Sequence, residues 1–290
     1  MSWHAVCLSF RWLQRAIDCA QSILGKCVSI ETVDAEVFVY EVPGGPATEP
    51  FLLRCRRSGG DLIDVYTKVT WQNCALGSLA CEVLANRLAR DIGFRVPEIV
   101  YVGLDSDFIE SVRAVSPFVA GRMAACVQPA FGSVSVGNGY TDARSRSLEV
   151  PMETLAEIWA FDRLILNVDR RAEKPNCLTN GTHIVLIDHE KSLNCEFIGT
   201  MINPFPWASG EPLAAEQRSP HVFRPHIVGE EVTLARLKSA WASLTDQQID
   251  AYAAVIPAQW PVNVTAVTDY LKLLRHNVDT AFGELRSALQ

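Results

Sequence analysis

The chain has 290 residues, of which 49% are hydrophobic and 20% charged, and its formal net charge is −7. This length and apolar content suffice for one large domain or two lobes with a sizeable core. The acidic balance argues against a surface dedicated to nucleic acid or to anionic membranes, because both require clustered Lys and Arg. The densest basic run, RCRR at 54–57, is short, and we interpret it as a solvated loop face.

The cysteine pattern and the N-terminal residues bear on where in the cell the protein is located. Nine cysteines, an odd number with no CxxC pair, form neither a disulfide framework nor a zinc-binding pattern. Reduced, mostly buried thiols predict a cytoplasmic protein. Residues 1–26 predict an amphipathic helical extension, since Arg11 and Arg15 interrupt its apolar residues. No window approaches the roughly 18 unbroken apolar residues of a membrane span, so we expect no membrane association.

The first part of the chain predicts a β-rich unit. Strand-like runs at 27–33, 36–42 and 61–69 are separated by the turn signals PGGPATEP and RRSGGD, which favours an antiparallel sheet. A helix is expected from about Leu76 to Ile92, stopped by Gly93 and followed by the strand VPEIVYVGL. The segment FIESVRAVSPFVAG at 108–121 predicts one more strand.

The second part predicts mainly helices. GSVSVGNGYTDARSRS at 132–147 is rich in Gly and Ser and predicts a mobile loop. Apolar residues at helical spacing follow Pro151, and the last sixty residues contain several amphipathic helical patterns. One short strand, THIVLIDHE, interrupts this helical half.

Polar residues gather in the stretch FDRLILNVDRRAEKPNCLTNGTHIVLIDHEKSL at 161–193. The helix that begins at Pro151 is expected to end near Asn167, which leaves Asp169 and Asn176 on a loop, whereas Asp188 follows a strand. An acid on a loop and an acid at a strand end can converge on a metal ion, and Mg²⁺ prefers such oxygen ligands.

Phosphoryl transfer from a nucleotide requires such a set. A carboxylate orients the attacking hydroxyl, an Asp and an Asn hold Mg²⁺, and a Lys paired with a helical acid contacts the phosphates. Upstream, Lys68 in DVYTKV and Glu82 in LACEVLANRLA occur in the expected order. Each residue alone has a structural explanation, such as a solvated strand Lys or a turn-capping Asp. Their joint order favours the functional interpretation.

These segments resemble the HipA-like kinase domain family, a branch of the protein-kinase-like superfamily related in motif to the phosphatidylinositol kinases. The likeness covers roughly residues 30–285 and is carried by YTKV, ACEVLANRLARDIGFRVPEIVYV, FDRLILNVDRR, PNCL and VLIDHEKSLN. The resemblance implies that Lys68 contacts the α- and β-phosphates of ATP and that Glu82 pairs with Lys68. It also implies that Asp169 is the catalytic aspartate and that Asn176 and Asp188 bind Mg²⁺.

Smaller roles follow from the same resemblance and from local pattern. Arg170, counted with the catalytic residues, is expected to position the loop or the phosphates, and Asn167 to brace the loop. Asp162, which lies on the helix seven residues before Asp169, is interpreted as structural. His189 is interpreted as a packed or hydrogen-bonded histidine rather than a general base.

The sequence departs from the kinase pattern at three places. Most kinase loops have the metal-binding Asn five residues after the Asp, but here position 174 is Lys and Asn176 lies seven residues after; Asn180 is a competitor for the role. No GxGxxG occurs, so the nearest candidate phosphate cover is SGGD, with Ser58, Gly59 and Gly60. The adenine hinge is assigned by position alone to VSPFVAG.

The expectation is a two-lobed α+β protein-kinase-like fold with an antiparallel sheet in the N-lobe and a mainly helical C-lobe. Its parts are the extension at 1–26, the N-lobe at 27–120 and the C-lobe at 121–290. We expect transfer of the γ-phosphoryl group of ATP, with Mg²⁺, to a hydroxyl of a protein Ser or Thr, and no direct nucleic-acid binding. Two alternatives stay open: a catalytically weak or inactive nucleotide-binding module, and a small-molecule or lipid kinase.

Overall fold

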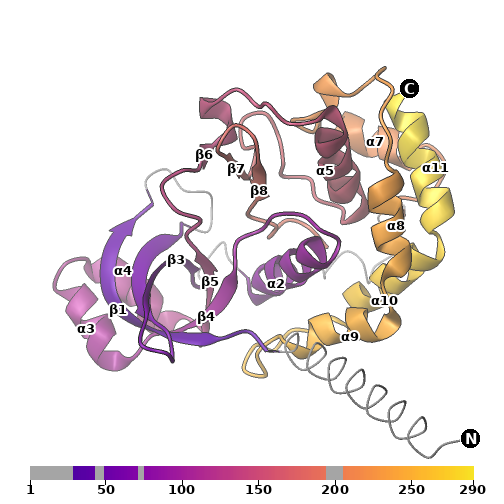
Figure 1. The fold of residues 1–290 in the computed structure, drawn as a ribbon. Helices are drawn as coiled ribbons and strands as arrows, with labels where there is room; N and C mark the ends of the chain where they lie inside the picture. Colours follow the sequence, from indigo (N-terminus) through magenta and orange to yellow (C-terminus); the bar gives the residue numbers. More distant parts are fainter. Residues whose placement is uncertain (1–28, 43–48, 71–74, 194–204) are drawn as a thin grey trace, which may run out of the picture. The chain divides into compact units, whose positions relative to one another are not determined.

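A computed structural model describes residues 29–42, 49–70, 75–193 and 205–290. Contacts within the chain separate residues 1–30 from 31–290, and the longer part forms one compact unit of strands and helices. This mixed composition confirms the α+β prediction (Figure 1). The helix predicted at 1–26 lies outside the described residues. Among the helices that are described, none is long and apolar enough to cross a membrane.

Strands of the N-terminal part close into a barrel in the order β1-β2-β3-β5-β4. They are β1 (Thr32–Glu41), β2 (Phe51–Arg56), β3 (Leu62–Lys68), β4 (Ile99–Gly103) and β5 (Ala130–Val134). Neighbours pair antiparallel, except that the start of β1 pairs parallel with β4. The prediction of a purely antiparallel sheet was therefore wrong at this edge. Two register shifts in β1 accompany the closure, since bulges bend and twist a strand.

The first three residues of the basic run at 54–57 lie in β2 rather than in a loop, and Arg57 follows the strand. From Leu53 onward, buried and exposed side chains alternate along β2, so that Arg54 and Arg56 face solvent while Leu53 and Cys55 are buried with Phe51 in the barrel core. Arg54 Nε lies 2.9 Å from Asp64 Oδ1 on β3. Strand β5 pairs with both β3 and β4, so the barrel extends to Val134, beyond the boundary expected at residue 120.

Helix α2 (Leu76–Asp91) confirms the helix predicted between β3 and β4. The strand predicted at 108–121 is wrong, because α3 (Ser106–Arg113) and α4 (Pro117–Ala125) occupy this segment. Side-chain caps explain the difference. Asp105 Oδ1 accepts from the backbone N–H of Phe108 at 2.7 Å, and Ser116 caps α4, whose first residue is Pro117.

A small sheet stands beside the barrel in the described part of the chain. Its strands are β6 (Thr141–Asp142), β7 (Cys177–Thr179) and β8 (Ile184–Leu186), in the order β6-β7-β8. The mobile loop predicted at 132–147 is thus partly regular, since it contains the end of β5, strand β6 and the 3-10 helix η1 (Ala143–Ser145). Helix α5 (Met152–Leu164) confirms the helical pattern after Pro151.

The helical end of the chain also agrees with prediction. It consists of α7 (Glu211–Arg218), the 3-10 helix η2 (Arg224–His226), α8 (Ala235–Ser243), α9 (Asp246–Ala254), α10 (Thr265–His276) and α11 (Val278–Leu289). Helix α9 packs against α2, and α8 and α11 pack together. Helix α2 lies between the barrel and the C-terminal helices, and it contacts α9 (Figure 1).

Candidate active site

A cavity of about 640 Å³ lies between the barrel and the small sheet. This volume is within the range of small-molecule sites, which is roughly 300–1,000 Å³. Its lining includes most of the polar residues singled out in the sequence: Lys68, Glu82, Asn176 and Asp188, together with Lys174. Residues from β3, α2, the loop after α5 and the end of β8 therefore meet at one hollow.

Lys68 is the last residue of β3, and its ammonium group contacts three carboxylates. Its Nζ lies 2.7 Å from Asp188 Oδ1, 3.0 Å from Glu190 Oε2 and 3.4 Å from Glu82 Oε2. Burial alone would lower the pKa of Lys68, but these negative charges raise the pKa well above its ordinary value. The side chain is therefore a buried ammonium group on the cavity wall.

Glu82 is buried on the face of α2 that packs toward the barrel. Burial raises the pKa of its carboxyl, while the charge of Lys68 acts in the opposite direction. A helical acid of this kind fixes the direction of the strand lysine. The pair expected from the sequence is thus formed, with a third acid, Glu190, sharing the same lysine.

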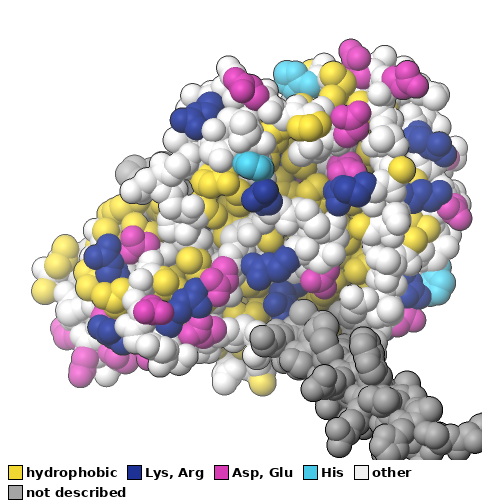
Figure 2. All heavy atoms as spheres, in the orientation of Figure 1, with side chains coloured by type: hydrophobic (Ala, Val, Ile, Leu, Met, Phe, Trp, Pro, Cys, Tyr) yellow, Lys and Arg dark blue, Asp and Glu magenta, His cyan; other side chains and the backbone are white. Residues whose placement is uncertain are grey.

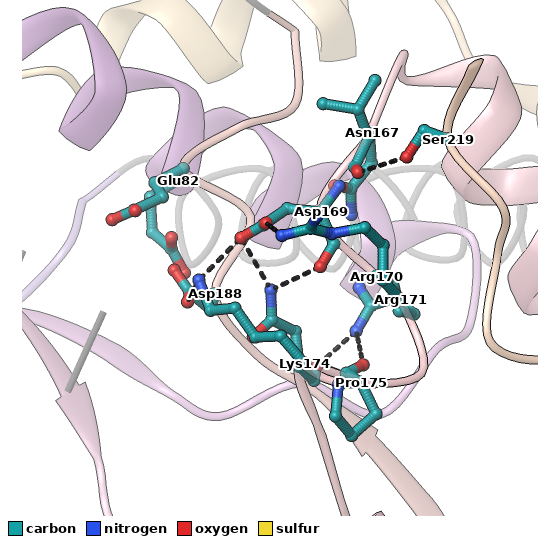
Figure 3. A network of polar contacts seen from close by, with 12 residues as sticks. Glu82, Asn167, Asp169, Arg170, Arg171, Lys174, Pro175, Asp188 and Ser219 are labelled. Atoms are coloured by element: carbon teal, nitrogen blue, oxygen red, sulfur yellow. Dashed lines mark hydrogen bonds and ion pairs between the residues drawn. The ribbon is translucent and has the colours of Figure 1, made fainter. Parts of the chain in front are cut away.

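The loop after α5 holds Asp169 by hydrogen bonds from its own flanks. Asn167 Oδ1 accepts from the backbone N–H of Asp169 at 3.0 Å, and Asn167 Nδ2 donates to Asp162 Oδ1 at 2.8 Å. Asn176 Nδ2 donates to Asp169 Oδ2 at 3.2 Å, and Lys174 Nζ donates to the same oxygen at 2.6 Å (Figure 3). Asn167 braces the loop, as expected, and Asn176 joins the loop to Asp169.

Arg170 has a different place from the one expected of a catalytic group. Its side chain is fully buried, pairs with Asp162 and donates to the carbonyl oxygens of Pro175, at 3.2 Å, and Asn176. Neither Arg170 nor Asp169 is among the residues that line the cavity, but Asp169 contacts Lys174 and Asn176, which do line it. The Arg170 guanidinium ties the two ends of the loop together. This agrees with the expectation that Arg170 positions the loop, and it makes Arg170 a positioning residue rather than a group that touches substrate.

Asp162 anchors this buried network. The backbone N–H of Phe223 donates to His221 Nδ1 at 3.1 Å, so the other ring nitrogen, Nε2, carries the proton and donates to Asp162 Oδ2 at 2.9 Å. Burial would raise the pKa of the Asp162 carboxyl, but Arg170 and His221 hold it well below its usual range. The interpretation of Asp162 as structural agrees with these contacts.

Asn176 and Asp188 share an unusual backbone conformation. Their φ angles are 47° and 59°, in the left-handed region that Asn and Asp tolerate better than other side chains. The backbone N–H of Ile187 donates to the Asn176 carbonyl at 3.0 Å, which joins the start of β7 to the end of β8. Non-glycine residues in this region concentrate at functional sites. Both residues lie just outside the strands of the small sheet, and both line the cavity.

The next residue, His189, is fully buried, and burial lowers its pKa to about 3. It is therefore a neutral, packed imidazole. Its Nε2 lies 3.4 Å from Arg170 Nη2, and its ring meets Phe161 edge-on. These contacts agree with the interpretation of His189 as structural rather than basic.

Asp188 and Asn176 are the candidate oxygen donors for a metal ion at this site. Asp188 and Asn176 supply a carboxylate and an amide beside Asp169, and Mg²⁺ is commonly held by one or two carboxylates together with substrate phosphates. Both oxygens of Asp188 already contact ammonium groups, Oδ1 that of Lys68 and Oδ2 that of Lys174. Among the described residues, no group of three or more His, Cys, Asp or Glu side chains is arranged to hold a metal ion by itself. A metal at Asp188 would therefore need further ligands, such as phosphate oxygens.

Two predicted segments do not reach the cavity. The turn containing Ser58, Gly59 and Gly60 lies at the opposite end of β2 and β3 from Lys68, and Ser58 Oγ donates to Glu31 at 3.1 Å. The assignment of this turn as phosphate cover was wrong, because the turn closes one end of the β2–β3 hairpin and Lys68 lies at the other end. The cavity is lined instead by Val42 and Pro50, at the end of β1 and just before β2.

The adenine hinge was also misplaced. VSPFVAG, at 115–121, lies mostly in α4, outside the cavity lining, whereas Ser133 to Gly137, at and after the end of β5, line the cavity. Asn180, the competitor of Asn176, lies in the turn between β7 and β8, where its Oδ1 accepts from the backbone of Thr182 and His183. Asn176 is the one that meets Asp169.

Two residues of the site were not predicted. Lys174 contacts both Asp169 and Asp188, and Glu190 contacts Lys68. Lys174 was visible as a departure from the usual kinase loop. Glu190 gave no signal beyond its position two residues after Asp188.

A sequence model of the HipA-like kinase family matches residues 39–288. The chain belongs to the HipA-like kinases. The match includes Lys68, Glu82, Asp169, Asn176 and Asp188, and it confirms the resemblance found in the sequence. Membership in this family supports a kinase-like function for the chain.

Comparison with individual proteins adds less. No curated protein matches the chain. Among solved structures, a crystal structure of the Helicobacter pylori proinflammatory kinase CtkA is similar over 90% of this chain and 96% of that chain. The two chains are 11% identical, and the TM-score is 0.41.

Proposed function

We propose that this HipA-like kinase binds ATP with Mg²⁺ and transfers the γ-phosphoryl group to a hydroxyl of a protein Ser or Thr. In this proposal the barrel with α2 forms the N-lobe of a two-lobed protein-kinase-like fold, the helices after β5 form the C-lobe, and the 640 Å³ cavity takes the nucleotide. Family membership supports the kinase reaction. The geometry of the cavity supports the choice of residues.

Each side chain has one role in the proposed reaction. The Lys68 ammonium binds the α- and β-phosphates, and Glu82 holds Lys68 in direction. Asp188 and Asn176 would hold Mg²⁺, which when bound neutralises charge on the phosphates. Asp169 orients the acceptor hydroxyl and takes its proton as the new O–P bond forms and the bond to ADP breaks.

One observation carries the proposal: Lys68 contacts Asp188 at 2.7 Å although 119 residues separate them in the sequence. Helix α2 delivers Glu82 to the same ammonium, and Lys174 joins Asp188 to Asp169. Buried ion pairs contribute little net stability, because desolvation offsets much of the attraction. A buried cluster of this size at a cavity is therefore typical of a functional site.

The acceptor and the compartment are inferred from weaker observations. The chain has a formal net charge of −7, whereas an anionic lipid surface attracts a basic excess, and acidic and basic side chains both occur on the face shown in Figure 2. This favours a protein acceptor over a lipid. Cys55, Cys81 and Cys177 are buried free thiols, which agrees with the proposed cytoplasmic location.

Mass spectrometry of the purified chain after incubation with ATP and Mg²⁺, alone and with a mixture of Ser- and Thr-containing peptides, tests the proposal. We expect added phosphate on the chain or on a peptide, and at least about a hundredfold slower transfer by Asp169→Asn. Arg113→Gln, an exposed change on α3, is a control that should transfer at the wild-type rate. Equal transfer by wild type and Asp169→Asn would refute the assignment of Asp169.

A second candidate is a nucleotide-binding module without turnover. The contacts of Lys68 and Lys174 with both oxygens of Asp188 favour it, because a lysine that stayed in place would exclude the metal. Calorimetric binding of ATP without any phosphate transfer or ADP release would support this candidate over the kinase.

A further inference from the structure

Lys174 occupies the space between the two acids of the site. Its Nζ lies 2.6 Å from Asp169 Oδ2 and 2.9 Å from Asp188 Oδ2, so one ammonium bridges both carboxylates (Figure 3). The side chain of Lys174 is 27% exposed, against 13% for Asp169 and 11% for Asp188. The lysine thus reaches in from the open side of the cavity.

The bridge competes directly with a divalent cation. A metal held by Asp188 needs at least one of its carboxylate oxygens, and Mg²⁺ requires oxygens in near-octahedral geometry at roughly 2.0–2.1 Å. Lys68 takes Oδ1 and Lys174 takes Oδ2. Lysine is a compact point charge on a flexible stem, so its ammonium can leave without a change in the backbone.

The charges explain what would draw the lysines away. Four carboxylates, those of Glu82, Asp169, Asp188 and Glu190, face the ammonium groups of Lys68 and Lys174. The phosphates of a nucleotide offer these ammonium groups new anionic partners. When the lysines move to the phosphates, Asp188 regains free oxygens, and the site then carries enough negative charge to need a divalent cation.

We propose that Lys174 is a displaceable internal cation that keeps divalent metal out of the site until nucleotide phosphates draw it away. This inference rests on the proposed nucleotide and metal site, and it adds an order of binding to it. Metal binding then depends on nucleotide, and free Mg²⁺ alone does not occupy the loop. Lys174 is a positioning residue, since its role is exerted through Asp169 and Asp188.

Electron paramagnetic resonance of Mn²⁺, which reports free metal, tests this without any turnover. The full chain is titrated with Mn²⁺ in the absence of nucleotide, as wild type, Lys174→Met and Arg171→Met. Arg171 is the matched control, because it contacts Asp169 at 3.3 Å but not Asp188 and is half exposed. We expect Lys174→Met to bind free Mn²⁺ on the order of tenfold more tightly than wild type, and Arg171→Met to change affinity by less than about threefold.

A second titration separates this inference from the proposed function. The second titration uses a non-hydrolysable ATP analogue, and the Mn²⁺ that the analogue binds by itself in buffer is subtracted. Wild type should then bind Mn²⁺ tightly, and the gain in Mn²⁺ affinity caused by the analogue should be smaller in Lys174→Met. Suppose that the analogue raises the Mn²⁺ affinity of wild type, but that Lys174→Met and wild type have the same Mn²⁺ affinity in the absence of the analogue. The proposed nucleotide and metal site is then retained, and the proposed role of Lys174 is wrong. An equal rise in Arg171→Met would also overturn it, since it would show a general charge effect. If the analogue brings no Mn²⁺ to wild type, both proposals fail.

Discussion

Single residues divide this site into groups that touch the cavity and groups that hold them in place. Lys68, Glu82 and Asp188 lie at the cavity, whereas Arg170 and Asp162 lie beneath the loop and are fully buried. Two adjacent arginines show the division most sharply. Arg170 is inaccessible to solvent, and Arg171 is half exposed.

Arg170→Ala should destabilise the protein by about 3–5 kcal/mol, because it leaves the buried Asp162 carboxylate without its main ion pair and frees both ends of the loop. Arg171→Ala should change the free energy of unfolding by less than about 1 kcal/mol, since exposed ion pairs contribute little. Urea unfolding of both variants measures the contrast. Similar losses in the two would show that the buried network does not hold the loop.

His221 makes stability depend on pH. Burial lowers its pKa, opposed in part by Asp162, so the folded protein resists a proton that the unfolded chain accepts below the ordinary histidine pKa. Stability is thus present above that value and is lost as the pH falls through it, by up to about 1.4 kcal/mol per pH unit for one proton.

The slope of unfolding free energy between pH 6.5 and 5 should therefore be smaller in His221→Gln than in wild type. His226→Gln removes an exposed imidazole five residues later and serves as the comparison. Urea unfolding at several pH values gives the slopes. A steeper slope in His221→Gln than in wild type would contradict the neutral, buried histidine.

Among the secondary-structure elements, the ones with strong periodicity were predictable and the short ones were not. Helix α2 and the C-terminal helices carry apolar residues at helical spacing over two or more turns. Strand β2 was missed because its exposed arginines resemble a basic loop, and α3 and α4 were missed because their caps, Asp105 and Ser116, outweigh a β-like composition.

The barrel also depends on one glycine that periodicity does not reveal. A Cβ on Gly132 in β5 would lie 2.6 Å from Val65, 2.8 Å from Val102 and 2.9 Å from Val100. Gly132→Ala should therefore lose about 1–3 kcal/mol of stability through overpacking. Gly283→Ala in α11 meets no atom within 4 Å and should gain up to about 1 kcal/mol, since Ala favours helix. Thermal unfolding of both variants gives the signs, and a stable Gly132→Ala would mean that the barrel interior is looser than described.

The order of the candidate site residues along the chain could be predicted from the sequence, but several of their contacts could not. The sequence predicted Lys68, Glu82, Asp169, Asn176 and Asp188 because kinase chemistry needs these side chains in this order. It could not predict that Lys174 bridges two acids or that the turn at 58–60 points away, because both depend on the direction of strands and loops in space.

One nucleotide in the proposed site would contact both the barrel and the loop that follows α5. Mg²⁺ with a non-hydrolysable ATP analogue should stabilise the folded protein and so raise its unfolding temperature. The gain in free energy of unfolding is about 2.7 kcal/mol when the ligand is at a hundred times its Kd. The rise should be lost in Lys68→Met. Differential scanning fluorimetry with the analogue, with and without Mg²⁺, measures it, and an equal rise in Lys68→Met would place the nucleotide elsewhere.

Calorimetric titration of the purified chain with a non-hydrolysable ATP analogue tests whether Lys68 and Asp188 belong to one nucleotide and metal site. Wild type should bind more tightly with Mg²⁺ than without it, Asp188→Asn should lose this dependence on Mg²⁺, and Lys68→Met should bind more weakly in both conditions. Binding that is indifferent to Mg²⁺ in wild type, or unchanged in both variants, would contradict the account.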